Sequence, residues 1–397
     1  MRGKVAIIGA GMIPFGEHFD KGLMDMAQEA YLNCLKSVDK GIDPKEIKAA
    51  WFGQWSGGMI GQGAQAGSSL ASIIGNMEIP ITRIENGCPT GADTFRNACL
   101  GVASGVYDVV LALGVEKMRD KPGAESLIAV GGSAVPVLSD MHPSWLLGGG
   151  GPSLQALYAT RQMYELGCTM EDFARVAVKN HHNGVLCPYA HYRFEVTIER
   201  VLQSYVVCWP LHLLDCCPQT DGAAAVLLCR AELARKYTDK PVYVLGSNLG
   251  LDHANYWDKH NFIEMLCTVR AARGAFQMAG ITPQDLDFAE VHDCFTNTEL
   301  LNIEDIGICR KGEAHKLLKE GEFNMDGRIP INPSGGLKAH GHPIAATGIG
   351  QICEVYWQLR EEADQRQVKI KKGIGLQHNV GGPGFGVSGV NILSRSL

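Results

Sequence analysis

Hydrophobic residues along the chain follow two patterns: short continuous runs, and longer stretches with helical spacing. Val5–Ile8 is a run of four apolar residues followed by glycine, which predicts a buried strand. Within residues 22–38 the apolar side chains recur every three or four positions, which predicts an amphipathic helix. The chain is therefore expected to open with a strand and then a helix.

The same order of elements recurs in the second half of the chain. Residues 41–53 form a glycine turn, a short helical turn that begins at proline, and an apolar strand, and residues 280–292 repeat this order at an offset of 280 − 41 = 239 residues. A similar offset, 342 − 88 = 254, relates two turns that each lead into a helix. These matches predict two copies of one α/β unit.

Composition narrows the class of protein. A chain of 397 residues with 46% hydrophobic residues can bury one large core or two, which excludes a disordered chain. No apolar run reaches the roughly 18 residues that span a bilayer, and the N-terminus is typical of a strand and turn and not of a signal peptide. The net charge of -6 and the lack of basic runs argue against nucleic acid as a partner.

Thirteen cysteines are scattered through the chain without regular spacing, which favours reduced thiols over a disulfide framework. We therefore expect a cytoplasmic protein that binds neither membrane nor nucleic acid.

Candidate chemistry centres on Cys88, which lies between an apolar strand and a helix rich in small residues that is expected to begin at this cysteine. A thiol at a helix N-terminus meets unpaired N–H groups and the positive end of the helix dipole, so we predict a lowered pKa and a nucleophilic role. The alternative is a small buried hydrophobe, because free cysteine packs well.

Three further motifs supply partners for this thiol. The sequence HDCF at residues 292–295 follows an apolar run at residues 286–291, which predicts a buried strand. Residues 332–348 form a glycine-rich turn that contains His342 and leads into a helix. Residues 377–384, with the sequence QHNVGGPG, offer exposed backbone N–H groups near the C-terminus.

Together these motifs resemble the thiolase superfamily, and specifically its sterol-carrier-protein-2-type branch, along essentially the whole chain. The resemblance implies an α/β fold of five layers, αβαβα, built from two repeated β-α halves with an inserted loop domain. Residues 1–118 and 220–239 would form the N-terminal half, and residues 240–397 the C-terminal half. Residues 119–219 would form the loop domain, which covers the active site and holds coenzyme A.

The resemblance also implies a role for each candidate residue. Cys88 would be the nucleophile that forms an acyl-enzyme, and His342 the base that takes its proton. Cys294 would move a proton at the α-carbon of the acyl group. His292 and His342 would donate N–H groups to one oxyanion, and the backbone N–H groups of Cys88 and Gly381 to a second.

Some features depart from the family pattern or have plainer explanations. Asn379 stands where the biosynthetic branch has a cysteine, so the acid/base role would fall to Cys294. Pro89 follows the nucleophile where a small residue is commoner, and Ala345 replaces a glycine. His342 could instead cap a helix, and Cys294 could be a buried core thiol.

Other polar residues give weaker signals. Lys338 would contact a coenzyme A phosphate or face solvent. Adjacent Cys216 and Cys217 lack the spacing of zinc ligands, and the pair His181 and His182 belongs to a block that matches the family. We therefore expect no metal and no redox cofactor, with coenzyme A as a substrate.

The implied reaction is cleavage of a 3-oxoacyl-CoA by free coenzyme A, or the reverse Claisen condensation. Acetoacetyl-CoA and an aromatic 3-oxoacyl-CoA such as benzoylsuccinyl-CoA are both open as substrates. The alternatives are a noncatalytic subunit, an enzyme dependent on a small zinc-ribbon/OB-fold partner, and a thiolase-like aldolase that does not require Cys88. The family further implies a homodimer formed through the predicted strand Ile81–Ile84.

Overall fold

The computed structural model describes residues 1–57, 66–120 and 150–397. Residues 121–149 of the predicted loop domain lie outside this part of the chain. The strands are β1 (Val5–Met12), β2 (Ala49–Gly53), β3 (Ile81–Ile84), β4 (Val109–Glu116), β5 (Val206–Cys208), β6 (Leu211–His212), β7 (Gly222–Arg230), β8 (Val242–Leu251), β9 (Phe288–Glu290), β10 (Ile374–Gly381) and β11 (Val387–Ser394).

Helices connect these strands and cover both outer faces. The α-helices are α1 (Leu23–Lys36), α2 (Ala66–Ile74), α3 (Thr90–Ala103), α6 (Gly151–Leu166), α7 (Met170–Leu186), α8 (Ile198–Leu202), α9 (Leu266–Ala279), α10 (Thr296–Ile306), α11 (Ala314–Lys319), α12 (Gly336–His340) and α13 (Ile344–Arg360). The short 3-10 helices are η1 (Pro44–Glu46), η2 (Leu213–Asp215), η3 (Ala231–Lys236), η4 (Tyr256–Asp258), η5 (Pro283–Asp285), η6 (Asp364–Arg366) and η7 (Pro383–Phe385).

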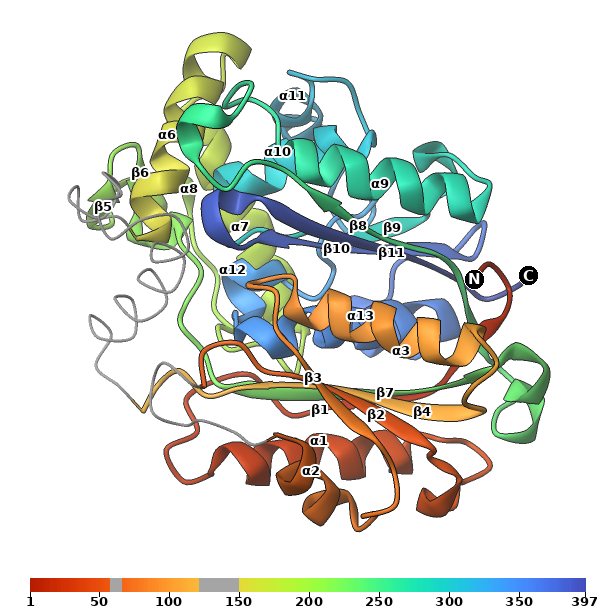
Figure 1. The fold of residues 1–397 in the computed structure, drawn as a ribbon. Coiled ribbons are helices and arrows are strands. Elements are labelled where there is room, and N and C mark those ends of the chain that lie inside the picture. The colour runs from red at the N-terminus through yellow and green to blue at the C-terminus, as the bar shows by residue number, and fades with distance from the viewer. Residues whose placement is uncertain (58–65, 121–149) are drawn as a thin grey trace.

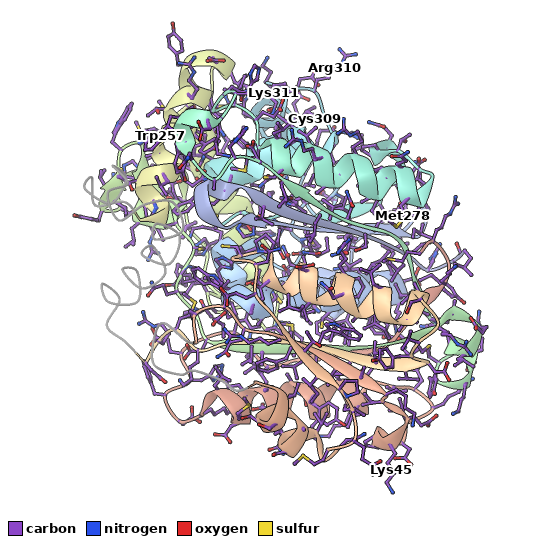
Figure 2. The ribbon with its side chains drawn as sticks, in the orientation of Figure 1. Lys45, Trp257, Met278, Cys309, Arg310 and Lys311 are labelled. Atoms are coloured by element: carbon purple, nitrogen blue, oxygen red, sulfur yellow. The ribbon has the colours of Figure 1, made fainter. Side chains whose placement is uncertain are left out.

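The molecule is built from five layers, as the resemblance implies (Figure 1). Helices α1 and α2 cover one face of a sheet that contains β1–β4 and β7, and helices α3 and α13 fill the space behind it. A second sheet, β8–β11, lies on the other side of these two helices and is covered by α9 and α10. Charged side chains such as Lys45 and Arg310 extend outward at opposite ends of this stack (Figure 2).

The two halves share one topology, which confirms the predicted repeat. In the first half β2 is parallel to β4, and β4, β7 and β1 follow one another as antiparallel neighbours. In the second half β9 is parallel to β10, and β10, β11 and β8 follow in the same antiparallel order. The prediction that residues 41–53 and 280–292 are equivalent is therefore correct.

The two sheets join through a short contact between β1 and β8, where Ala6 pairs with Tyr243 and Ile7 with Val242. The resulting strand order is β3-β2-β4-β7-β1-β8-β11-β10-β9, so β3 is an edge strand. Apolar side chains fill the spaces between the layers, with Met26 and Leu111 beneath the first sheet, Phe95 and Ile349 between the sheets, and Phe276 and Leu376 above the second.

The predicted elements at the start of the chain are present with small shifts in their ends. The strand predicted at Val5–Ile8 is the first part of β1, and the amphipathic pattern at residues 22–38 forms α1. The sequence predicts a helix that begins at Cys88. In the structure α3 begins two residues later, at Thr90, with Pro89 as its N-cap. Among the described helices, none is both long and apolar enough to cross a lipid bilayer.

Candidate active site

Cys88 and His342 occupy equivalent positions in the two halves. Each lies two residues before a helix of the central layer, α3 or α13, and each is followed by the proline that forms the N-cap. The two helices touch near their N-termini, where a Cβ on Gly91 would lie 2.6 Å from the carbonyl oxygen of Ala345. A Cβ on Gly348 would lie 2.4 Å from the backbone nitrogen of Ala92. Only glycine permits this approach, which brings the two candidate residues together.

His292 joins them from the end of β9 in the second sheet. One side-chain atom from each of Cys88, His292 and His342 lies within 4.8 Å of the others. The two imidazole rings meet edge to face, with centroids 5.2 Å apart and an interplanar angle of 84°. Three residues separated by up to 254 positions in the sequence (342 − 88) therefore form one cluster.

The Cys88 thiol is protonated in the resting site, contrary to the sequence prediction. Burial raises its pKa to about 12, and the opposing hydrogen bonds from the backbone N–H groups of Gly382 and of Cys88 itself only reduce that rise. The predicted lowering is wrong because desolvation of the thiolate outweighs the helix terminus, which begins two residues further on. A base is consequently needed to activate this thiol at neutral pH.

The backbone at Gly381 and Gly382 packs directly against Cys88. A Cβ on Gly381 would lie 2.7 Å from the Cys88 sulfur, and a Cβ on Gly87, which has φ = +60°, would lie 2.7 Å from the Cα of Gly382. The Gly382 N–H, which was not among the predicted site groups, lies within hydrogen-bond reach of the sulfur. Its signal in the sequence is the glycine run in GGPG.

His342 is held with its base nitrogen facing the cluster. Its Nδ1 lies 2.9 Å from the Thr347 hydroxyl oxygen, and that hydroxyl donates its single proton to the carbonyl oxygen of Pro343 at 3.1 Å. We assign the hydroxyl proton to this bond, so Thr347 accepts from Nδ1–H and Nε2 carries no proton. Burial lowers the pKa of His342 to about 3, so the ring is neutral and Nε2 is a free base.

His342 does not cap a helix, because α13 has Pro343 at its N-cap and no side-chain capping bond. Its Nε2 is buried and has no hydrogen-bond partner among the described residues. The helix-cap alternative is therefore wrong.

His292 is completely buried and is fixed through its backbone. Its N–H donates to Nδ1 of His378 at 3.3 Å, and its carbonyl oxygen accepts from the Asn302 side chain at 3.0 Å. Its Nδ1 lies 3.3 Å from Nδ2 of Asn379, while Nε2 has no partner within the described part of the chain. Burial, with His342 and His378 nearby, holds the pKa of His292 well below its usual value.

Cys294 lies beside this cluster and not within the 4.8 Å set. It is only 4% exposed, and burial raises its pKa well above the usual value, so it carries a proton. Its carbonyl oxygen accepts from the backbone N–H of Cys217 at 2.9 Å. Residues 216–219 run alongside both histidine motifs, since Cys216 pairs with Phe295 and Gln219 with His342. This crossing segment was not predicted.

Asp293 links the HDCF motif to the loop that carries His342. Its carboxylate accepts from the backbone N–H groups of Leu337 at 2.6 Å and Lys338 at 3.2 Å, and from Asn180 at 2.7 Å. Burial, and the nearby carboxylate of Glu299, raise its pKa to about 7. Asp293 therefore connects the HDCF motif to the glycine-rich loop through hydrogen bonds, a role that was not predicted from the sequence.

Lys338 does not face solvent, so that alternative is wrong. The residue is 1% exposed, and its ammonium lies 5.9 Å from the centre of the Tyr192 ring. Burial lowers the pKa of Lys338, while Cys217, Cys216 and Asp215 oppose that change. Contact with a coenzyme A phosphate stays a prediction.

The cluster of Cys88, His292 and His342 also has donor atoms and spacing suited to a soft divalent metal such as zinc. Within the described ranges this set, and not the Cys216–Cys217 pair, has that spacing. A protonated thiol beside an unprotonated imidazole is equally the arrangement of a nucleophile and its general base. The backbone N–H groups of Gly382 and Cys88 beside the sulfur are donors of the kind that stabilise an oxyanion.

Comparisons with known proteins show the family to which the chain belongs. A family model described as "Thiolase, N-terminal domain" matches residues 5–204, and "Thiolase C-terminal domain-like" matches residues 249–395. The acetyl-CoA acetyltransferase of Methanothermobacter thermautotrophicus is 44% identical over 391 residues, which are 98% of this chain and 99% of that protein. Benzoylsuccinyl-CoA thiolase subunit BbsB of Thauera aromatica is 32% identical over 96% of this chain and 95% of its own.

A solved structure, the Ltp2-ChsH2(DUF35) aldolase, superposes with a TM-score of 0.83 at 25% identity, covering 99% of this chain and 98% of that chain. The family models and these relatives define the class of protein as a thiolase-type acyltransferase. The chain belongs to the thiolase family and is similar over its full length to acetyl-CoA acetyltransferases.

Proposed function

We propose that this protein is a coenzyme-A-dependent thiolase. It cleaves a 3-oxoacyl-CoA with free coenzyme A, or runs the reverse Claisen condensation, through an acyl-Cys88 intermediate. The observation that carries the proposal is the convergence of a protonated thiol, an unprotonated His342 Nε2 and a second buried imidazole within 4.8 Å.

The first half-reaction transfers the acyl group to the enzyme. His342 Nε2 takes the proton of Cys88, and the thiolate attacks the 3-oxo carbon of the substrate. The bond between C2 and C3 breaks, and its electrons form the enolate of acetyl-CoA. The enolate oxygen accepts N–H bonds from His292 and from the newly protonated His342. Cys294, whose pKa burial keeps high, gives its proton to C2.

The second half-reaction regenerates the enzyme. Free coenzyme A gives its thiol proton to Cys294, and its sulfur attacks the carbonyl of acyl-Cys88. The backbone N–H groups of Cys88 and Gly381 donate hydrogen bonds to the tetrahedral oxyanion and stabilise its charge. Collapse releases the shortened acyl-CoA, and Cys88 regains its proton from His342.

Short acyl substrates fit the comparisons best. The relative at 44% identity is named for acetyl transfer, whereas the benzoylsuccinyl-CoA thiolase subunit is 32% identical. We therefore propose acetoacetyl-CoA before an aromatic 3-oxoacyl-CoA such as benzoylsuccinyl-CoA.

An aldolase is the second candidate, because the solved structure described above is named as one. That name also includes a second component, ChsH2(DUF35), which supports our proposal that a small zinc-ribbon/OB-fold protein assists this chain. We further propose a homodimer formed through the edge strand β3, since the exposed edge of a sheet is suited to pairing with a second copy. Light scattering of the purified protein tests the dimer, and a monomer at micromolar concentration would refute it.

The reaction is tested by incubating the protein with acetoacetyl-CoA and free coenzyme A and measuring acetyl-CoA. Cys88→Ala should lower kcat by at least about 10³-fold, whereas Cys309→Ala should match the wild type. Cys309 is a suitable control because it is partly buried and lies in the outer layer near α11 (Figure 2). Cleavage of a 3-hydroxyacyl-CoA that survives in Cys88→Ala would instead establish the aldolase.

A further inference from the structure

Behind His292 lies a continuous line of buried side-chain amides, formed by Asn391, Gln377, Gln351 and Asn379 and called here the amide chain. We propose that the amide chain keeps the proton of His292 on Nε2 and so makes this residue a permanent N–H donor toward the substrate. The proposal rests on the proposed function, because it assigns to Asn379 the positioning of one oxyanion donor. Asn379 acts through His292 and is a positioning residue.

The amide chain is continuous and directional. Ser247 donates to Oδ1 of Asn391 at 2.6 Å, and Asn391 Nδ2 donates to Oε1 of Gln377 at 2.7 Å. Gln377 Nε2 then donates to Oδ1 of Asn379 at 2.9 Å and to Oε1 of Gln351 at 3.0 Å. After the Ser247 hydroxyl, each donor is an amide nitrogen and each acceptor is the amide oxygen of another side chain. The orientation of every amide therefore depends on its neighbours.

The last amide of this chain, that of Asn379, determines which ring nitrogen of His292 carries the proton. Asn379 Nδ2 donates to Oε1 of Gln351 at 2.7 Å, and its second N–H points at Nδ1 of His292, 3.3 Å away. An amide nitrogen cannot accept a hydrogen bond, so Nδ1 of His292 must offer its lone pair. A neutral imidazole then carries its proton on Nε2. That atom is buried and has no partner among the described residues, so its N–H is free to bind substrate.

The two histidines of the cluster consequently hold opposite tautomers. His342 presents a bare Nε2 because Thr347 accepts from its Nδ1–H, and His292 presents Nε2–H because Asn379 donates to its Nδ1. The His342 ring can therefore accept a proton at Nε2, and the His292 ring can donate a hydrogen bond from Nε2–H. In both rings Nδ1 contacts a supporting side chain and Nε2 is buried without a partner among the described residues, so the division of roles comes from the residues that contact each Nδ1.

The same tautomer limits metal binding at the cluster. A zinc ion bound by Cys88, His292 and His342 needs a lone pair on both imidazoles at the metal-facing nitrogen. The proton on His292 Nε2 removes one of these three ligands. A hydrogen-bond acceptor in place of the Asn379 amide nitrogen would move the His292 proton to Nδ1. His292 Nε2 would then have a lone pair, and all three side chains could bind the metal.

The direct test is ¹⁵N NMR of histidine-labelled protein at pH 7, with the His292 signal assigned by its loss in His292→Asn. We expect a protonated Nε2 and an unprotonated Nδ1 on His292, and the opposite arrangement on His342. An Nδ1–H tautomer on His292, as would follow if every amide of the chain were flipped, would overturn the proposal. This readout does not depend on turnover, so it is separate from a failure of the proposed function.

A second test uses Asn379→Asp, which replaces the donor by a carboxylate that accepts from Nδ1–H. We expect the His292 tautomer to reverse, and kcat to fall about 10²–10³-fold with little change in KM, as for loss of one oxyanion donor. Zinc affinity, measured by competition with a chromophoric chelator, should rise about 10–100-fold.

The matched control is Asn183→Asp, because Asn183 is 1% exposed and donates to the Asn332 carbonyl, and within the described residues it has no hydrogen bond to His292 or His342. It carries the same penalty for burying an acid and should keep both the wild-type tautomer and the wild-type zinc affinity. Equal zinc affinities and equal tautomers in Asn379→Asp and the wild type would refute the proposal.

Discussion

At the scale of single residues, the Cys88 thiol and the His342 imidazole are both uncharged before substrate binds. Burial raises the pKa of Cys88 to about 12 and lowers the pKa of His342 to about 3, so thiol and imidazole are both uncharged at pH 7. The lowered pKa of Cys88 that the helix terminus predicts is absent because desolvation of the thiolate is the larger effect. The nucleophile is therefore generated only when His342 takes the proton during attack.

This account predicts that Thr347 controls the base. In Thr347→Val the partner of His342 Nδ1–H is lost, so the ring can rotate or change tautomer, and kcat should fall at least about 10-fold. KM should change little, because Thr347 contacts the histidine and not the substrate. Thiolysis kinetics of acetoacetyl-CoA provide the measurement.

The conservative variant Thr347→Ser serves as the control, because it keeps the hydroxyl and should recover most of the wild-type rate. Equal kcat in the valine variant and the wild type would show that the Thr347 contact does not orient the base.

The motifs of the sequence located Cys88, His292, Cys294 and His342 at or beside one cluster, but they did not reveal what supports them. Their supports are contributed by distant segments, such as residues 216–219 against the HDCF motif, and Asn379 behind His292. Such contacts depend on the register of the sheets, which hydrophobic spacing along one segment does not encode.

At the scale of elements, the site depends on close backbone approach. Helices α3 and α13 meet at Gly91 and Gly348, and the end of β10 reaches Cys88 at Gly381. The glycine-rich turns were recognised in the sequence, yet the partner that each glycine meets belongs to the other half of the molecule. The boundary of α3 was misplaced by two residues because Cys88 and Pro89 precede its first helical turn.

Adding a methyl group at Gly381 tests this packing. The new Cβ would lie 2.5 Å from Cys88 Cβ and 2.7 Å from its sulfur, so Cys88 must shift. A displacement of this size should lower kcat about 10²-fold and cost about 1–3 kcal/mol of unfolding free energy. Activity assays and urea denaturation of Gly381→Ala measure the two effects.

Gly16→Ala is the control, since no atom lies within 4 Å of its new Cβ. It should retain wild-type activity. Full activity in Gly381→Ala, with an unchanged urea midpoint, would mean that this glycine is not required beside the thiol.

At the scale of the whole molecule, the cluster lies where the two repeated halves meet. Cys88 comes from the first half, and His292 and His342 come from the second, so neither half alone holds a nucleophile with its base. The repeat itself could be predicted from spacing, because each half keeps the same order of turn, strand and helix. The β1–β8 pairing that joins the sheets involves two residues from each strand and has no comparable signal in the sequence.

The central claim is that Cys88 carries the acyl group, and intact-protein mass spectrometry tests it most directly. The wild type, Cys309→Ala and Cys88→Ala are incubated with acetyl-CoA and a panel of other acyl-CoAs and then desalted. We predict an added acyl mass, free of coenzyme A, on the wild type and on Cys309→Ala, and none on Cys88→Ala. An adduct of equal yield on folded Cys88→Ala would contradict the claim, as would turnover of acetoacetyl-CoA by that variant at the wild-type rate.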